Sequence, residues 1–142
     1  QSDFGALDDG PLAGAHVLMV EDNPVNMTIA VAMLEQWGVQ VTQATDGAQA
    51  IAVVEAAERS GRPVDALLMD VQMPVMSGYE ATRRLRAAGC RVPILALTAA
   101  ALTSERAQAL ASGMNGFLTK PIDSRRLHDT LVSALGEARA AS

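Results

Sequence analysis

The sequence is poor in aromatic residues and contains a single cysteine, Cys90. Phe, Trp and Tyr make up 3% of its 142 residues, and one thiol allows neither an internal disulfide nor a cysteine-based zinc site. No apolar run approaches the length of a membrane span. Basic residues are not clustered and the net charge is −5, which argues against direct binding of nucleic acid. These absences favour a cytoplasmic protein that makes no membrane contact through this segment.

The two ends of the chain look different from its middle. Residues 1–13 are rich in Asp and Gly, which is typical of a linker or tail, and they have no signal-peptide pattern. The chain does not start with Met, so we expect it to be a piece of a longer protein. One domain is expected over residues 14–136, followed by an Ala-rich tail over 137–142.

Strand and helix patterns alternate along the rest of the chain. Short apolar runs predict buried strands, and capping residues and glycines mark where helices begin and end. The expected strands are 16–21, 39–42, 65–70, 93–98 and 116–119, and the expected helices lie near 24–37, 46–60, 77–88, 103–113 and 123–135. Strands this apolar indicate a parallel sheet covered by helices on both faces. The predicted α/β fold is therefore flavodoxin-like, a doubly wound (βα)5 domain whose five-stranded parallel sheet has the order 2-1-3-4-5.

Side chains suited to phosphoryl chemistry lie at the ends of four predicted strands or directly after them. They are Glu21, Asp22, Asp70, Thr98 and Lys120, the last being the only lysine in the chain. Ligands of a doubly wound sheet bind beyond the carboxyl ends of its strands, so we expect these residues to converge. Three neighbouring carboxylates need a cation between them, and oxygen ligands favour Mg²⁺. With Mg²⁺ bound, a carboxylate can attack a phosphoryl donor, while a lysine and a threonine contact the phosphoryl oxygens.

Four sequence motifs carry a resemblance to a known family. They are EDNPVN (21–26), MDVQMPVMSG (69–78), LTA (97–99) and GMNGFLTKPI (113–122). In this order they resemble the bacterial response-regulator receiver family over about residues 15–136, most of all the receivers fused to hybrid sensor histidine kinases. The resemblance implies that Asp70 accepts a phosphoryl group from a phosphohistidine. It also implies that Asp22 binds Mg²⁺, with Glu21 behind it and the Gln72 backbone carbonyl as a further ligand.

The resemblance further implies a conformational switch. Thr98 would be the switch hydroxyl, and Lys120, joined to Pro121 by a cis bond, would contact the phosphoryl group. Phe117 stands where the family has its switch aromatic, and because it lacks a hydroxyl it would act by packing. Phosphorylation adds a charge of about −1.5 to −2 at Asp70. Turning toward that charge would repack the face formed by the fourth helix, fifth strand and fifth helix, and so control a partner or effector protein.

An apolar stripe on the first predicted helix indicates a docking surface. Met27, Val31 and Leu34 are spaced at i, i+4 and i+7, beside a second stripe expected to face the sheet. We interpret them as a docking face for the helices of a histidine kinase dimerisation domain or a histidine phosphotransfer domain. Ordinary partial burial of the three side chains is the alternative interpretation.

Other classes of protein share this topology. A hydrolase of the haloacid-dehalogenase type usually has a second Asp where this chain has Gln72, and a flavin carrier needs a phosphate-binding loop where Glu21 and Asp22 would repel phosphate. A receiver that serves as a phosphorylation-independent binding scaffold stays open as an alternative. The sequence favours a two-component phosphorelay receiver that assists its own phosphorylation and is not a stand-alone enzyme. We expect it to be the C-terminal receiver of a hybrid histidine kinase, on the cytoplasmic side if that kinase is membrane-bound.

Overall fold

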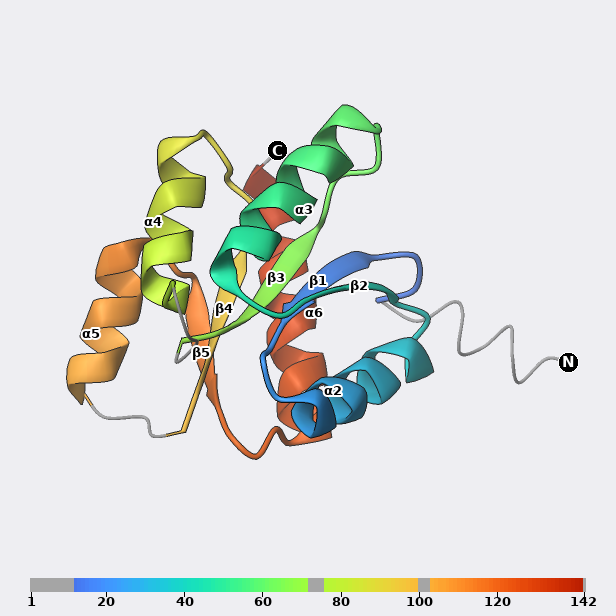
Figure 1. Ribbon diagram of the computed structural model, residues 1–142. Coiled ribbons are helices and arrows are strands. Elements are labelled where there is room, and N and C mark those ends of the chain that lie inside the picture. The colour runs from blue at the N-terminus through green and yellow to red at the C-terminus, as the bar shows by residue number, and fades with distance from the viewer. Residues whose placement is uncertain (1–11, 72–75, 100–102, 142) are drawn as a thin grey trace, which may run out of the picture.

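A single parallel sheet forms the centre of the molecule (Figure 1). The computed structural model describes residues 12–71, 76–99 and 103–141. The strands are β1 (His16–Val20), β2 (Gln40–Ala44), β3 (Ala66–Asp70), β4 (Ile94–Thr98) and β5 (Gly116–Thr119). They pair in parallel in the order β2-β1-β3-β4-β5, which confirms the predicted flavodoxin-like topology.

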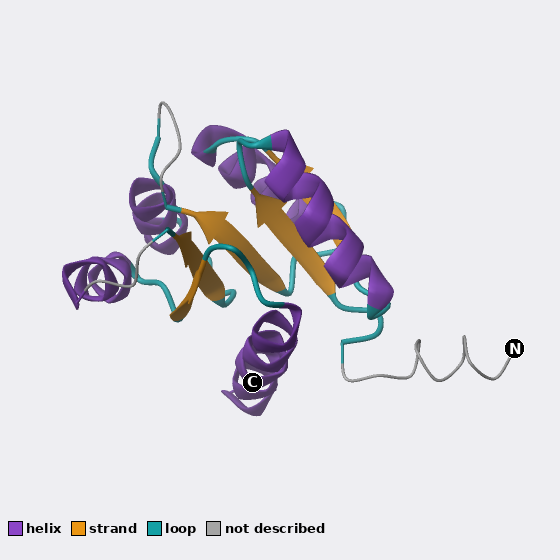
Figure 2. Cartoon of the chain, turned by 90° about the horizontal axis from the view of Figure 1, so that it is seen from below, coloured by secondary structure: helices purple, strands orange, loops and turns teal. Residues whose placement is uncertain are grey.

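Helices cover both faces of the sheet (Figure 2). They are α2 (Pro24–Gln36), α3 (Gly47–Arg59), α4 (Gly78–Ala87), α5 (Thr103–Ser112) and α6 (Ser124–Ala141). Successive strand residues point to opposite faces, so each strand contributes to two cores. Val17 and Met19 of β1 pack with α2 and α6, whereas Leu18 and Val20 pack with α3, α4 and α5. Both faces of the sheet are therefore dry, as continuous apolar strands require.

Helix boundaries follow the predicted capping residues. The side chain of Asn23 accepts hydrogen bonds from the N–H groups of Val25 and Asn26 at the start of α2, and Asp46 accepts one from Gln49 at the start of α3. After α2 the chain turns at Gly38, which has a φ of 79°, a value that glycine adopts without strain.

The described structure extends into both predicted tails. Leu12, assigned to the N-terminal tail, is completely buried in the core beside α2 and α6, and the N–H of Gly14 bonds to the carbonyl of Gly38. At the other end α6 continues past Gly136 to Ala141, through residues 137–141, where the predicted tail lies. Those residues are strong helix formers, so the helix does not end at a single glycine.

The burial of α2 corrects the predicted docking stripe. Met27 is 6% exposed and Leu34 is fully buried, and Val31 packs against the same core. The large apolar side chains exposed on this helix are Val25 and Ile29, at 65% and 48%. Apolar residues occur on every side of α2, so their spacing alone does not show which side faces the sheet. Met27 and Leu34 belong to the core and Val31 is partly buried against it, so the prediction that this stripe forms a docking surface was wrong.

Within the described part of the chain, no helix combines the length and the apolar character needed to cross a membrane.

Candidate phosphoryl and metal site

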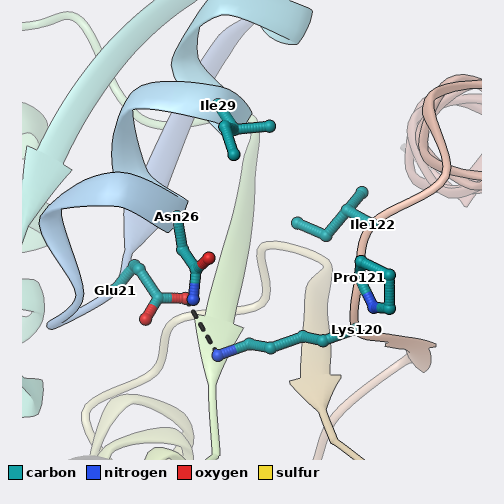
Figure 3. Close-up of a pocket in the computed structure, with 6 residues that line it drawn as sticks. All are labelled: Glu21, Asn26, Ile29, Lys120, Pro121 and Ile122. Atoms are coloured by element: carbon teal, nitrogen blue, oxygen red, sulfur yellow. Dashed lines mark ion pairs between the residues drawn. The ribbon is translucent and has the colours of Figure 1, made fainter.

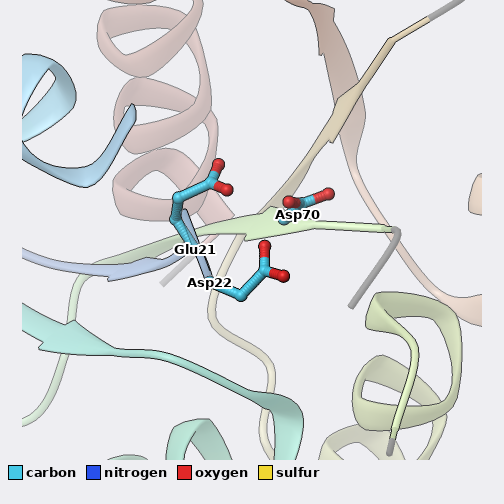
Figure 4. Close-up of side chains that lie close together, drawn as sticks. All are labelled: Glu21, Asp22 and Asp70. Atoms are coloured by element: carbon cyan, nitrogen blue, oxygen red, sulfur yellow. The ribbon is translucent and has the colours of Figure 1, made fainter. Parts of the chain in front are cut away.

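The predicted acids meet at the carboxyl edge of the sheet (Figure 4). Glu21 and Asp22 directly follow β1, and Asp70 is the last residue of β3, the neighbouring strand. β1 and β3 flank the point where the strand order reverses, which is where doubly wound sheets bind ligands. One carboxylate oxygen from each acid lies within 4.8 Å of the others, and Glu21 and Asp70 are 1% and 3% exposed. The convergence predicted from the sequence is present for all three acids.

Lys120 forms ion pairs with two of these acids. It follows β5, and its Nζ lies 2.9 Å from Oδ2 of Asp70 and 3.0 Å from Oε1 of Glu21, the ion pair drawn in Figure 3. Burial opposes protonation of the amine, but the close contacts with the carboxylates of Asp70 and Glu21 outweigh it and the pKa of Lys120 is raised. The bond from Lys120 to Pro121 is cis, as the resemblance implied. Lys120 is therefore a fixed positive charge beside the carboxyl group of Asp70.

The negative charge of the buried Glu21 carboxylate is only partly compensated. Burial raises the pKa of its carboxyl, and the charge of Asp70 raises it further, although Lys120 and the N–H of Asn23 act in the opposite direction. Oε2 accepts a hydrogen bond from that N–H at 3.2 Å. Among the buried side-chain atoms that the structure describes, Oε1 alone lacks a hydrogen bond of good geometry, despite its ion pair. Oxygen ligands with surplus negative charge suit a hard divalent cation.

The predicted switch residues lie beside this cluster and contact α5. Thr98, the last residue of β4, is 5% exposed, and its Oγ1 donates a hydrogen bond of 2.6 Å to Oε1 of Glu105. Phe117 of β5 is half-buried, and the guanidinium of Arg106 lies 4.6 Å from the centre of its ring. The backbone N–H of Lys120 bonds to the carbonyl of Thr98 at 2.8 Å, which ties the two strand ends together.

Sequence reasoning missed two residues that support the site. Glu105 has no sequence signal, because only the fold brings it to Thr98. Gly78 begins α4, and a Cβ at this position would lie 2.5 Å from the carbonyl oxygen of Asp70. Its glycine permits close approach of α4 to the end of β3. Gln72, the remaining predicted ligand, lies outside the described residues.

A groove beside the acids is open to solvent. It holds about 300 Å³ and is lined by Glu21, Asn26, Ile29, Lys120, Pro121 and Ile122. Ile29 of α2 and Ile122 face each other across it, while Glu21 and Lys120 form its charged floor (Figure 3). An apolar rim above a charged floor suits a partner that brings an apolar helix and a charged group together.

The fold is that of a known family. Residues 17–132 match the response regulator receiver domain, so the chain belongs to the receiver domains of two-component response regulators.

Its relatives include receivers within histidine kinases. The chain is 44% identical to "Probable histidine kinase 2" of Oryza sativa subsp. indica over 146 residues, covering 89% of this chain and 14% of that protein. It thus spans about one seventh of the relative's length. A solved receiver domain of sensor histidine kinase PA1611 from Pseudomonas aeruginosa PAO1, with a magnesium ion coordinated in its active site cleft, is 48% identical. It has a TM-score of 0.75 and covers 87% of this chain and 99% of that one.

A further relative was solved together with a partner. The receiver domain of Ssk1 from Saccharomyces cerevisiae, in complex with the histidine phosphotransfer signaling protein Ypd1, matches with a TM-score of 0.77 and 29% identity. The match covers 87% of this chain and 90% of the solved one.

Proposed function

We propose that Asp70 accepts a phosphoryl group from a phosphohistidine in a two-component phosphorelay. The observation that carries the proposal is the cluster of three carboxylates, with oxygens within 4.8 Å of one another, in which Lys120 Nζ lies 2.9 Å from Asp70. A cluster with this excess of negative charge is poised for a divalent cation and a transferred phosphoryl group.

Mg²⁺ is the cation that these residues fit. Asp22 and Asp70 would hold it, Glu21 would support it from behind, and the Gln72 carbonyl stays a proposed ligand. The magnesium in the cleft of the PA1611 receiver, together with the poorly satisfied Oε1 of Glu21, supports this assignment. When bound, Mg²⁺ neutralises charge on the transferred phosphoryl oxygens.

The surrounding side chains then assist the transfer. A carboxylate oxygen of Asp70 attacks phosphorus, the P–N bond of the phosphohistidine breaks, and its electron pair returns to the imidazole nitrogen. Lys120 has three N–H donors, and two of them face Asp70 and Glu21, so the third can reach a phosphoryl oxygen. Thr98 supplies a hydroxyl from the adjacent strand end. Lys120 and Thr98 thus stabilise the charge that moves onto Asp70.

Intact mass measurement after incubation with Mg²⁺ and acetyl phosphate tests the proposal. We expect wild type to gain the mass of one phosphoryl group and Asp70→Asn to gain none. Asp129→Asn removes an acid whose side chain is 72% exposed on α6, and this control should be labelled like wild type. If wild type takes no phosphoryl group from acetyl phosphate or from a phosphohistidine protein, the phosphorylation-independent scaffold is the better description.

We further propose that the phosphodonor docks on the groove beside Lys120. The donor would be a histidine phosphotransfer or histidine kinase dimerisation domain, whose helix would pack on Ile29 and Ile122. The complex of the Ssk1 receiver with Ypd1 supports this class of partner. Ile29→Glu should slow transfer from a phosphohistidine protein at least tenfold, because it buries a charge in an apolar contact, while labelling by acetyl phosphate stays near wild type.

The matched control for this docking test is Leu110→Glu. Leu110 is 65% exposed on α5, away from the groove, so its substitution should spare both reactions. Equal losses with both donors in Ile29→Glu would show that the substitution harms the site itself and would contradict docking at the groove.

The place of this domain in a larger protein is also a proposal. We propose that the receiver is the C-terminal part of a hybrid histidine kinase and acts in the cytoplasm. The receiver would span residues 14–136, and its core also includes Leu12. Its output would pass through the face formed by α5, β5 and α6, where Thr98 and Phe117 contact α5. An effector protein that binds this face would respond to phosphorylation.

A further inference from the structure

Two consecutive residues of α5 hold the two switch residues of the neighbouring strands. Glu105 accepts the hydroxyl proton of Thr98 at 2.6 Å, and Arg106 lies over the ring of Phe117 at 4.6 Å. Thr98 and Phe117 belong to β4 and β5, which are adjacent in the sheet. All four of these residues line one small cavity, and Tyr79 lines it as well. One turn of α5 therefore contacts both halves of the switch.

The hydroxyl of Thr98 can serve only one strong acceptor at a time. A threonine has a single O–H donor, and an ionised carboxylate and a phosphoryl group both act as acceptors only. In the structure this proton is directed to Glu105 of α5. A phosphoryl group on Asp70 would require the same proton, so the two acceptors compete for it.

We propose that Glu105 and Arg106 form a latch that holds Thr98 and Phe117 in the resting conformation and so weakens phosphoryl binding at Asp70. The proposal rests on the proposed function, because the competing acceptor is the phosphoryl group. Glu105 is a positioning residue: it acts through the proton of Thr98. When that proton moves to the phosphoryl group, the carboxylate of Glu105 loses its hydrogen bond and the first turn of α5 is released.

The position of Arg106 couples the two contacts. It follows Glu105 on the same helical turn, so a shift of this turn away from Thr98 also shifts the guanidinium from Phe117. Cation–π contacts at exposed positions are weak, and Arg106 is exposed, so the Glu105 hydrogen bond dominates the latch. This accounts for a switch aromatic that has no hydroxyl: Phe117 is held through its ring.

Binding of beryllofluoride with Mg²⁺, a mimic of the phosphoryl group, tests the latch without a kinase. Hydrogen bonds to charged groups are strong, but Glu105 is partly hydrated, so we expect Glu105→Ala to bind beryllofluoride about three- to tenfold more tightly than wild type. Glu105→Gln, which keeps the shape and a weaker acceptor, should fall between the two. Without ligand, amide hydrogen exchange in α5 should be faster in Glu105→Ala than in wild type. Exchange in wild type should reach the rate of the variant only when beryllofluoride is bound.

Two controls separate the latch from a general charge effect. Glu80→Gln removes the same charge from α4, where Glu80 pairs with Arg84 at 2.8 Å, and should leave the affinity unchanged. In a Thr98→Val background, which lacks the contested proton, Glu105→Ala should no longer tighten binding.

The outcomes also distinguish the latch from the proposed function. If wild type binds beryllofluoride and Glu105→Ala binds it equally or more weakly, the latch is wrong and the receiver chemistry stands. A gain that persists in the Thr98→Val background also overturns the latch. If wild type neither binds beryllofluoride nor accepts a phosphoryl group, the proposed function fails and the latch fails with it.

Discussion

The two edges of the sheet hold their charges in different ways. At the amino edge, Arg86 of α4 donates hydrogen bonds to the carbonyl oxygens of Gly113, Cys90 and Val92 and to Oδ1 of Asn115, at 2.7–3.0 Å. At the carboxyl edge, Lys120 is shared between Asp70 and Glu21, Asp22 adds another negative charge, and Oε1 of Glu21 lacks a well-formed hydrogen bond.

The difference separates a structural charge from a functional one. Burial lowers the pKa of Arg86, but its donors match the surrounding acceptors, so the group ties α4 to the segments that precede β4 and β5. The acids of the carboxyl edge repel one another, Lys120 offsets part of this repulsion, and a bound cation would offset more of it. We therefore expect substitutions at the amino edge to lower stability whether or not Mg²⁺ is present, and substitutions at the carboxyl edge to change stability in a way that depends on Mg²⁺.

The largest effect is expected for Arg86→Met. This substitution leaves several carbonyl oxygens without their charged donor, and we expect a loss of about 3 kcal/mol in the free energy of unfolding, measured by urea denaturation. Arg84→Met is the matched control on the same helix. Arg84 has a side chain that is 59% exposed and pairs only with Glu80 in the described structure, so its loss should stay within about 0.5 kcal/mol. Similar losses for the two variants would contradict a special role for Arg86.

Lys120→Met should have an intermediate effect that depends on the ligand. Without divalent cations it leaves two buried acids without a cation, and because water reaches Lys120 we expect a loss of about 2 kcal/mol, below that of a fully buried pair. Mg²⁺ should stabilise this variant more than it stabilises wild type, since it supplies the missing positive charge. Urea titrations with EDTA and with Mg²⁺ measure both values. Arg125→Met, at an exposed position on α6, should show neither change.

Much of the fold was predictable because local signals agreed with each other. Apolar strands bounded by caps such as Asn23 and by glycines such as Gly38 fixed the order of elements. The buried face of α2 was not predictable, because apolar residues such as Met27 and Ile29 surround that helix. Leu12 was missed because its apolar neighbours are few, and its burial depends on tertiary contacts with α2 and α6.

The residues of the candidate site also fall into a predictable group and an unpredictable group. The acids, Thr98 and Lys120 were predictable, because parallel strands bring their carboxyl ends to one edge. Glu105 and Gly78 were not, because each depends on how closely a helix approaches a strand end. The approach of α5 to β4 and of α4 to β3 is set by packing between distant segments, and no pattern along the chain records it.

The smallest effect, and the most direct test of the comparison, is expected for Asp22→Asn. Asp22 is exposed, and its carboxylate repels those of Glu21 and Asp70, so removing its charge should raise the stability of the ligand-free protein by about 1 kcal/mol. The same variant should lose most of the rise in melting temperature that Mg²⁺ produces in wild type, because binding energy appears as added stability. Asp129→Asn should change neither value. If Asp22→Asn were destabilised and still responded fully to Mg²⁺, the acids of the carboxyl edge would be structural like Arg86, and the contrast between the two edges would not hold.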